Sequence, residues 1–360
     1  MDTPFPVVSA SGSYYECGYQ HGKQVKELVR RNIDYYYGWW SRNLKMDKEM
    51  VTQRADSVIR VSKEYDSGLV DEMRGLADAV DVGLEEIASI NGRYELAWAN
   101  PEQLMGGCTC IAALPSVTAQ NKTILAQNWD YRVGVSDTCI VLKVKVNTGP
   151  EVIMHTEAGI IGHKGMNSEG IGLGINAMVS DLDRLGESVP FLLVCRKVLG
   201  SGRFSEAVRS FLNAKRSVSY NVMMAGEGVA VDLEAHPLDT SIINPKGGVL
   251  AHTNHFIGDR SFKIRDNFVL SEPSSINRYT VALERLKIRK DHSMESFKEI
   301  LSNHLDHPTS ICYHQTPGQE PDHWEETVSS VIMVPEDRLF MATGGPPCRN
   351  AYHKIPFSAP

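Results

Sequence analysis

The hydrophobic pattern of this 360-residue chain changes at Gly106 and Gly107, immediately before Cys108. Apolar residues before this pair recur at helical spacing, whereas many segments after it alternate apolar and polar residues with the period of a β-strand. A chain in which helices and strands are segregated favours an α+β fold, with antiparallel sheets covered by helical layers. Since no repeat and no long linker divides the chain, we expect one compact domain.

The same periodicities predict the individual elements. Helices are expected over 19–41, 47–65 and 70–99, the second capped by Asp47 and the third broken near Gly83. Later helices are expected over 190–199, 204–213, 275–289 and 294–305. One strand is expected to begin at Cys108. Further strands are expected over 123–129, 138–146, 151–155, 171–175, 220–225, 229–234, 327–334 and 338–343.

Composition narrows the class of protein. The net charge of −7 argues against a surface for nucleic acid or anionic membranes. No segment approaches the ~20 apolar residues of a membrane helix, and the first residues lack a signal-peptide pattern. We therefore expect a cytoplasmic protein with no nucleic-acid or membrane partner, and a homo-oligomer is compatible with the sequence. The seven cysteines do not form a secreted disulfide framework.

Cys108 is the strongest candidate for a nucleophile. Gly107 before it leaves a peptide bond with no side chain to obstruct a tight turn. The thiol can attack the Gly107 carbonyl and form a thioester that water releases, which leaves Cys108 as a new N-terminus. A free α-amino group titrates near ~8, so at neutral pH it can accept the thiol proton. One residue would then supply both nucleophile and base.

Several further motifs follow in a fixed order along the chain. They occupy residues 12–22, 72–77, 91–95, 107–109, 127–130, 165–172, 252–256 and 344–348. In these motifs the chain resembles the acyl-coenzyme A:6-aminopenicillanic acid acyltransferase (isopenicillin-N acyltransferase) family of N-terminal nucleophile (Ntn) hydrolases. The resemblance implies a four-layer αββα sandwich with two stacked antiparallel sheets, preceded by a mainly helical N-terminal segment.

The resemblance also implies residue roles. Cys108 matches the family's processed nucleophile, with cleavage between Gly107 and Cys108. Asn254 matches the asparagine whose side-chain amide helps to form the oxyanion hole. Asp130 matches the aspartate that orients the nucleophile and is needed for self-cleavage. A serine late in the chain is functional in the family.

That serine is Ser329 or Ser330, and the sequence does not choose between them. Thr109, beside the scissile bond, could assist the acyl shift, although simple β-propensity is enough to explain a threonine there. Ordinary structural interpretations exist for the other residues too. A cysteine is often a buried, inert side chain, an asparagine can stabilise a turn, and an aspartate at a strand end is commonly solvated.

Histidines permit two other interpretations. His304, His307, Cys312 and His314 lie close in sequence, but their mixed spacing and an intervening proline fit no standard zinc module. We therefore expect no metal site and no cofactor. A pair of the Cys108 thiol with an imidazole would be a nucleophile that needs no self-cleavage.

The sequence thus predicts a self-processing cysteine amidohydrolase or acyltransferase. An inactive precursor would cut itself into residues 1–107 and 108–360, which stay associated because strands of the larger chain bury an apolar face against helices of the smaller one. Cys108 would accept the acyl group of a small N-acyl amide, or of an acyl thioester such as acyl-coenzyme A, and pass it to water or an amine. The alternatives are an unprocessed Cys–His hydrolase and an inactive binding protein of the same fold.

Overall fold

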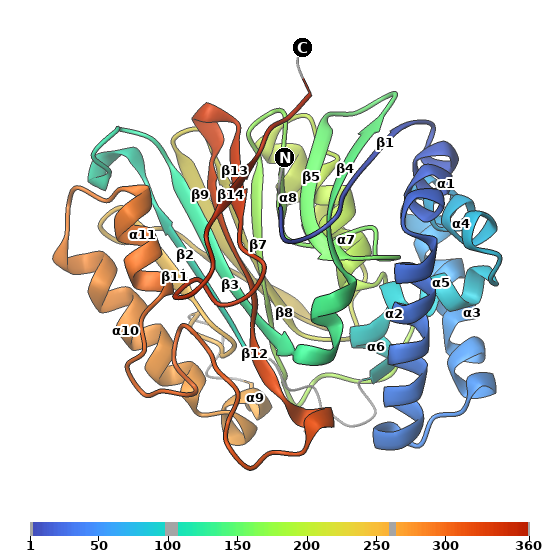
Figure 1. Ribbon diagram of the computed structural model, residues 1–360. Coiled ribbons are helices and arrows are strands. Elements are labelled where there is room, and N and C mark those ends of the chain that lie inside the picture. The colour runs from blue at the N-terminus through green and yellow to red at the C-terminus, as the bar shows by residue number, and fades with distance from the viewer. Residues whose placement is uncertain (1–2, 98–106, 259–263, 359–360) are drawn as a thin grey trace.

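The computed structural model describes residues 3–97, 107–258 and 264–358, so Gly106 and the expected helix end at Ala99 lie outside the described residues. Two sheets stack face to face in the centre (Figure 1). The first sheet has eight strands in the order β1 (Val7–Gly12), β4 (Cys139–Val146), β5 (Glu151–Glu157), β6 (Gly165–Asn167), β7 (Gly172–Ala177), β8 (Tyr220–Gly226), β9 (Val229–His236) and β10 (Asp239–Ile243).

The second sheet has six strands and contains the region around Cys108. Its order is β11 (Val249–His252), β2 (Cys108–Ala113), β3 (Ile124–Arg132), β12 (Glu325–Val334), β13 (Leu339–Ala342) and β14 (His353–Ile355). Strands β2 and β3 contact β7 of the first sheet. An apolar core fills the space between the sheets, with Cys110 and Leu125 from one sheet against Val141, Ile153 and Met223 from the other.

Helices cover the outer face of each sheet (Figure 1). On the side of the first sheet lie α1 (Tyr14–Gln24), α2 (Lys26–Trp39), α3 (Lys48–Tyr65), α4 (Ser67–Val80), α5 (Leu84–Asn91), α6 (Arg93–Ala97), α7 (Phe191–Leu199) and α8 (Phe204–Leu212). On the side of the second sheet lie α9 (Asn267–Ser271), α10 (Ser274–Ile288) and α11 (Met294–Leu301). The four-layer α+β prediction is therefore confirmed.

Some predicted details were wrong. The first sheet is not wholly antiparallel, because β1 runs parallel to β4, with Val7 opposite Val141. The expected helix over 19–41 is two helices, since Val25 leaves helical geometry at φ −133° and ψ 36°. Strand β3 continues to Arg132, which puts Asp130 inside a strand rather than at its end. Helix α11 ends at Leu301, before the expected 305.

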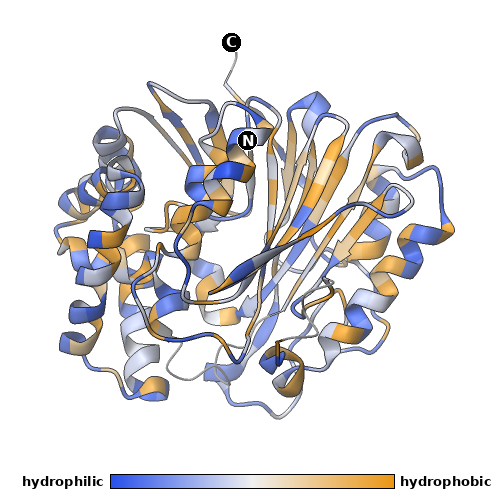
Figure 2. Cartoon of the chain, turned by 180° about the vertical axis from the view of Figure 1, so that it is seen from behind, coloured by the Kyte–Doolittle hydropathy of each residue, from blue (hydrophilic) through white to orange (hydrophobic). Residues whose placement is uncertain are grey.

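The hydropathy of the residues follows the layers. Strands of the central sheets are mostly apolar, whereas the helices on either side carry both apolar and hydrophilic residues (Figure 2). Strand β3 is buried along its whole length, as expected of a strand that has a layer on both faces. None of the described helices has the length and apolar content needed to cross a membrane.

The helices before Gly107 are joined to the later strands by buried polar contacts as well as by apolar packing. Arg93 on α6 forms an ion pair of 2.8 Å with Glu157 on β5, and both side chains are at most 1% exposed. The Asn91 side chain donates to the Gly159 carbonyl and accepts from the Ile161 N–H. Buried ion pairs and amides of this kind need their partners, because each lone group would lie unsolvated in the interior.

Candidate active site

The peptide unit between Gly107 and Cys108 is hydrogen-bonded at both of its polar atoms. The Asp130 N–H donates to the Gly107 carbonyl oxygen at 2.8 Å, because β2 and β3 pair in register at this point. The Cys108 N–H donates to Oδ1 of Asn254 at 2.9 Å. The structure therefore brings together the predicted residues Gly107, Cys108, Asp130 and Asn254, which come from three separate parts of the chain.

A side chain at Gly107 would fit tightly against its neighbours. A Cβ atom there would lie 3.0 Å from Oδ2 of Asp130 and 3.2 Å from Nη2 of Arg278. At these distances the two side chains would have to give way by a few tenths of an ångström. The glycine thus allows a carboxylate and a guanidinium to approach the backbone of this peptide unit.

The Cys108 thiol is buried and protonated at neutral pH. Burial first, and then the Asp130 carboxylate, raise its pKa to about 12, while the cations of Lys164 and Arg278 act in the opposite direction. A thiol must lose its proton to become a strong nucleophile. Attack by Cys108 in the uncut chain therefore needs a base close to the sulfur.

Arg278 on α10 contacts this peptide region from the outer side of the sheet. Its Nη1 donates to the Cys108 carbonyl oxygen at 2.8 Å and to Oγ1 of Thr109 at 3.2 Å, and its Nη2 donates to Oδ1 of Asn254 at 2.9 Å. Sequence reasoning missed this residue, because one arginine within a predicted helix has no distinguishing pattern. Its three contacts fix the carbonyl of the nucleophile and the Asn254 amide together.

Asp130 is held by a residue from β12. The Thr327 hydroxyl donates to its Oδ1 at 2.6 Å, while its Oδ2 is buried and has no hydrogen-bond partner among the described residues. Burial raises the pKa of the Asp130 carboxyl to about 7, although Arg278 and the Thr327 hydroxyl lower it. Asp130 can therefore gain or lose a proton near neutral pH.

The two candidate serines point to opposite faces of the sheet. Ser329 lies opposite Trp129, which lies opposite Cys108, so these three side chains share one face. Ser329 Oγ is buried and has no hydrogen-bond partner among the described residues. Ser330 is on the other face, where its Oγ lies 2.7 Å from the Tyr352 hydroxyl. The geometry favours Ser329, two strands away from Cys108.

Lys164 is a second residue that sequence reasoning missed. It is fully buried, and its ammonium lies 4.1 Å from the centre of the Trp129 ring, beside the row that contains Cys108. Burial lowers its pKa to about 7, although the nearby Cys139 and Cys108 side chains raise it. A lysine within a glycine-rich stretch, residues 159–174, was the available signal in the sequence. An amine with this pKa can act as a base at neutral pH.

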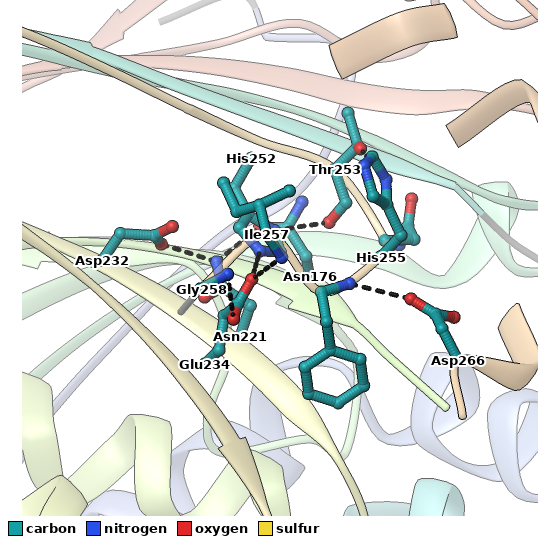
Figure 3. A network of polar contacts seen from close by, with 12 residues as sticks. Asn176, Asn221, Asp232, Glu234, His252, Thr253, His255, Ile257, Gly258 and Asp266 are labelled. Carbon is teal, nitrogen blue, oxygen red and sulfur yellow. Dashed lines mark hydrogen bonds and ion pairs between the residues drawn. The ribbon is translucent and has the colours of Figure 1, made fainter. Parts of the chain in front are cut away.

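The loop that carries Asn254 is fixed by Glu234 on β9 (Figure 3). This carboxylate lies 2.9 Å from Nε2 of His252 and accepts the backbone N–H groups of Ile257 and Gly258. Burial disfavours the charged imidazole, yet the carboxylates of Asp232 and Glu234 raise the pKa of His252 to about 9. Both flanks of Asn254 are therefore tied to one buried ion pair.

The two histidines beside Asn254 are engaged away from the thiol. His252 is paired with Glu234, and Nδ1 of His255 lies 2.9 Å from the Ser275 hydroxyl. Asp130, Lys164 and Arg278 are the largest charged influences on the Cys108 pKa, and none of them is a histidine. His252 and His255 therefore give no support to the Cys–His alternative.

Comparison with known proteins assigns the family. The sequence model of the acyl-coenzyme A:6-aminopenicillanic acid acyltransferase family matches residues 117–345. The chain belongs to this family. The matched range includes Asp130, Asn254, Ser329 and Ser330 but begins after Cys108. Family membership supports acyl transfer or acyl hydrolysis on a small-molecule substrate.

A curated relative agrees with this assignment. The 40 kDa form of acyl-coenzyme A:6-aminopenicillanic-acid-acyltransferase from Emericella nidulans is 27% identical over 308 residues, which cover 85% of this chain and 84% of the relative. Among solved structures, a mutant of conjugated bile acid hydrolase from Clostridium perfringens aligns with a TM-score of 0.42 and 13% identity, over 71% of this chain and 97% of that chain. Penicillin V acylase from Agrobacterium tumefaciens aligns with a TM-score of 0.41 and 12% identity, over 69% and 86%.

The Glu234 ion pair predicts a pH-dependent contribution to stability. We expect Glu234→Gln to lower the free energy of unfolding by about 1.5–3 kcal/mol at pH 7, because it removes a charged acceptor from a buried imidazolium. The pKa of His252 is raised in the folded state, so this contribution is fully present below the unfolded pKa of ~6.5 and is lost as the pH rises through about 9. Urea unfolding at several pH values measures it.

Glu227→Gln is the matched control for this measurement. Glu227 pairs with Arg338 at 2.7 Å, but the two side chains are 57% and 34% exposed. Its loss should change the free energy of unfolding by no more than about 1 kcal/mol. Equal effects of the two substitutions, or a Glu234→Gln effect that does not shrink above pH 9, would contradict the importance of the buried pair.

Proposed function

We propose that this protein is a precursor that cuts its own peptide bond between Gly107 and Cys108 and then acts as an N-terminal cysteine amidohydrolase or acyltransferase. The observation that carries this proposal is the double hydrogen bonding of that peptide unit next to the thiol. The Gly107 carbonyl faces the Asp130 N–H, and the Cys108 N–H faces Asn254. A carbonyl that already faces a donor gains stabilisation as negative charge develops on its oxygen.

Self-cleavage would begin with the Cys108 thiol. The sulfur gives up its proton and attacks the Gly107 carbonyl carbon, the C–N bond breaks, and the nitrogen leaves as the amine of Cys108. Water then hydrolyses the thioester, which releases the Gly107 carboxylate and restores the thiol. Lys164, with a pKa of about 7, is the base that we assign to the first step, since the Cys108 α-amine does not exist before the cut.

The liberated amine would serve as the base in each later cycle. Cys108 attacks the acyl carbonyl of the substrate, its α-amine takes the thiol proton, and the leaving group departs with that proton. The Asn254 amide nitrogen carries two hydrogens, of which one is donated to the Ala177 carbonyl at 2.9 Å. We assign the other to the substrate oxyanion. Water or an amine then attacks the thioester and releases the acyl group.

The substrate we propose is a small N-acyl amide or an acyl thioester such as acyl-coenzyme A. The family's acyltransferase activity and the buried thiol support a small acyl group. The segments 1–107 and 108–360 would remain together after the cut, because α6 and β5 share the buried pair of Arg93 and Glu157. Thr109, held by Arg278, and Ser329, on the Cys108 face, are accessory residues in this proposal.

A covalent-trapping experiment tests the proposed function. Wild-type protein treated with an activated acyl ester should give one acyl adduct on the fragment 108–360, detected by intact-mass spectrometry after rapid acid quench. The Cys108→Ala variant should remain one chain and take up no acyl group, whereas the buried Cys110→Ala variant should behave like wild type. Acylation of an uncut wild-type chain would instead support a hydrolase without self-cleavage.

The role of Lys164 is tested separately. Lys164→Met keeps the length of the side chain but removes the amine, so we expect self-cleavage to slow by about 10²-fold or more. Lys143→Met, at a largely buried lysine on β4 that lies 3.5 Å from Glu151, is the matched control and should cleave at the wild-type rate. Cleavage is monitored by electrophoresis of samples taken at set times after synthesis of the chain. Normal cleavage in folded Lys164→Met would remove Lys164 from the mechanism.

A further inference from the structure

A second cluster of reactive side chains lies away from Cys108, where two loops of the C-terminal region meet. His304, Cys312 and His314 come from the loop between α11 and β12, and Cys348 comes from the loop between β13 and β14. One ligand atom of each residue lies within 4.8 Å of those of the others. Cys312 is buried, His314 is half-buried, and His304 and Cys348 reach the surface. All the cysteines are free thiols.

The spacing around Nε2 of His314 is close to that of a tetrahedral zinc site. Nε2 of His314 lies 3.0 Å from Nε2 of His304, 3.5 Å from Sγ of Cys312 and 3.6 Å from Sγ of Cys348. With Zn–N near 2.0–2.1 Å and Zn–S near 2.3 Å, a tetrahedron has N···N edges of about 3.3 Å and N···S edges of about 3.6 Å. The three edges at His314 Nε2 are therefore within about 0.3 Å of those of a zinc tetrahedron, and the ligand atoms of all four residues lie within 4.8 Å of one another.

Hydrogen bonding among the four residues does not explain their convergence. Nε2 of a neutral imidazole either donates one hydrogen or accepts at one lone pair, so His314 Nε2 can satisfy one of the three atoms around it. A divalent cation satisfies all four ligands at once. Two thiolates and two imidazoles in a tetrahedral arrangement are typical of Zn²⁺.

The cluster is supported by a fixed backbone. The Cys312 N–H donates to the Asn303 carbonyl, the Ser310 hydroxyl donates to the Cys312 carbonyl at 2.7 Å, and the His314 N–H donates to the Pro308 carbonyl. Ligands set by such bonds lose less conformational entropy when an ion binds.

The cluster is also connected to the candidate active site. Cys312 and His314 flank Tyr313, whose N–H donates to Thr327 Oγ1 at 2.9 Å and whose carbonyl accepts the Thr327 N–H. The same Thr327 hydroxyl donates to Asp130. An ion that held Cys312 and His314 would therefore fix the segment that positions Thr327, and through it Asp130.

We propose that His304, Cys312, His314 and Cys348 bind one Zn²⁺ ion in a closed structural site that fastens the loop around Tyr313. Both thiols lose their protons to solvent on binding, and the two imidazoles bind as neutral ligands. All four positions are filled by protein, so the ion has no open place for a substrate. This proposal revises the expectation of no metal, which considered local spacing alone and did not include Cys348, 34 residues beyond His314.

Metal analysis of tag-free protein tests the proposal. Protein expressed with zinc and passed through gel filtration should contain about one zinc per chain, and the double variant Cys312→Ser, Cys348→Ser should contain almost none. Cys108→Ala removes a thiol outside the cluster and should keep its zinc. Because Cys108→Ala lacks the proposed nucleophile, this result does not depend on the proposed function. Zinc-free wild type, or full zinc retention in the double variant, would overturn the proposal.

Two further measurements guard against a misfolded double variant. His304→Gln changes a surface ligand and should lower the zinc content while the circular dichroism spectrum stays that of wild type. Replacement of the ion by Co²⁺ should give the visible bands of tetrahedral cobalt with thiolate charge transfer. Octahedral cobalt bands, or a disulfide between Cys312 and Cys348 in protein purified without oxidant, would contradict the site.

Discussion

The candidate active site is built around one peptide unit, between Gly107 and Cys108, whose carbonyl oxygen and N–H are both hydrogen-bonded. Strand β2 lies between β11 and β3. Its first residue, Cys108, lies opposite Trp129 of β3, whereas β11 ends opposite Cys110, so that the loop after β11 lies beside Cys108. The β3 neighbour supplies the Asp130 N–H, and the loop after β11 supplies the Asn254 oxygen. The sheet order thus fixes the Gly107 carbonyl and the Cys108 N–H without any contribution from the Cys108 side chain, whose sulfur remains available for chemistry.

Charged groups around this peptide unit are buried, and each is fixed by another polar group. Arg278 contacts the Cys108 carbonyl and Asn254, Thr327 holds Asp130, and Glu234 holds both flanks of Asn254. In a low-dielectric interior such contacts are strong when they are complete and costly when one partner is missing. The network therefore positions the reactive groups and also makes the site sensitive to the loss of any one of them.

Part of this arrangement could be predicted from the sequence. The strand beginning at Cys108, the Asp47-capped helix (α3, Lys48–Tyr65) and the closing hairpin of β12 and β13 followed from local periodicity and turn residues. The resemblance to a family gave Asp130 and Asn254, which the structure places on either side of the Gly107–Cys108 peptide unit.

Other features depend on contacts between distant residues and have no local pattern. Arg278 is one of two arginines on α10, and its role appears only when the helix packs over β2. The grouping of Cys348 with His314 likewise requires two loops to meet.

N-terminal sequencing of fully active protein tests the central claim most directly. The account predicts two sequences in equal amounts, one from the start of the chain and one that reads Cys-Thr-Cys-Ile-Ala from Cys108. Active protein that gives a single sequence from Met1 would contradict it, because the amine assigned as the catalytic base would then not exist.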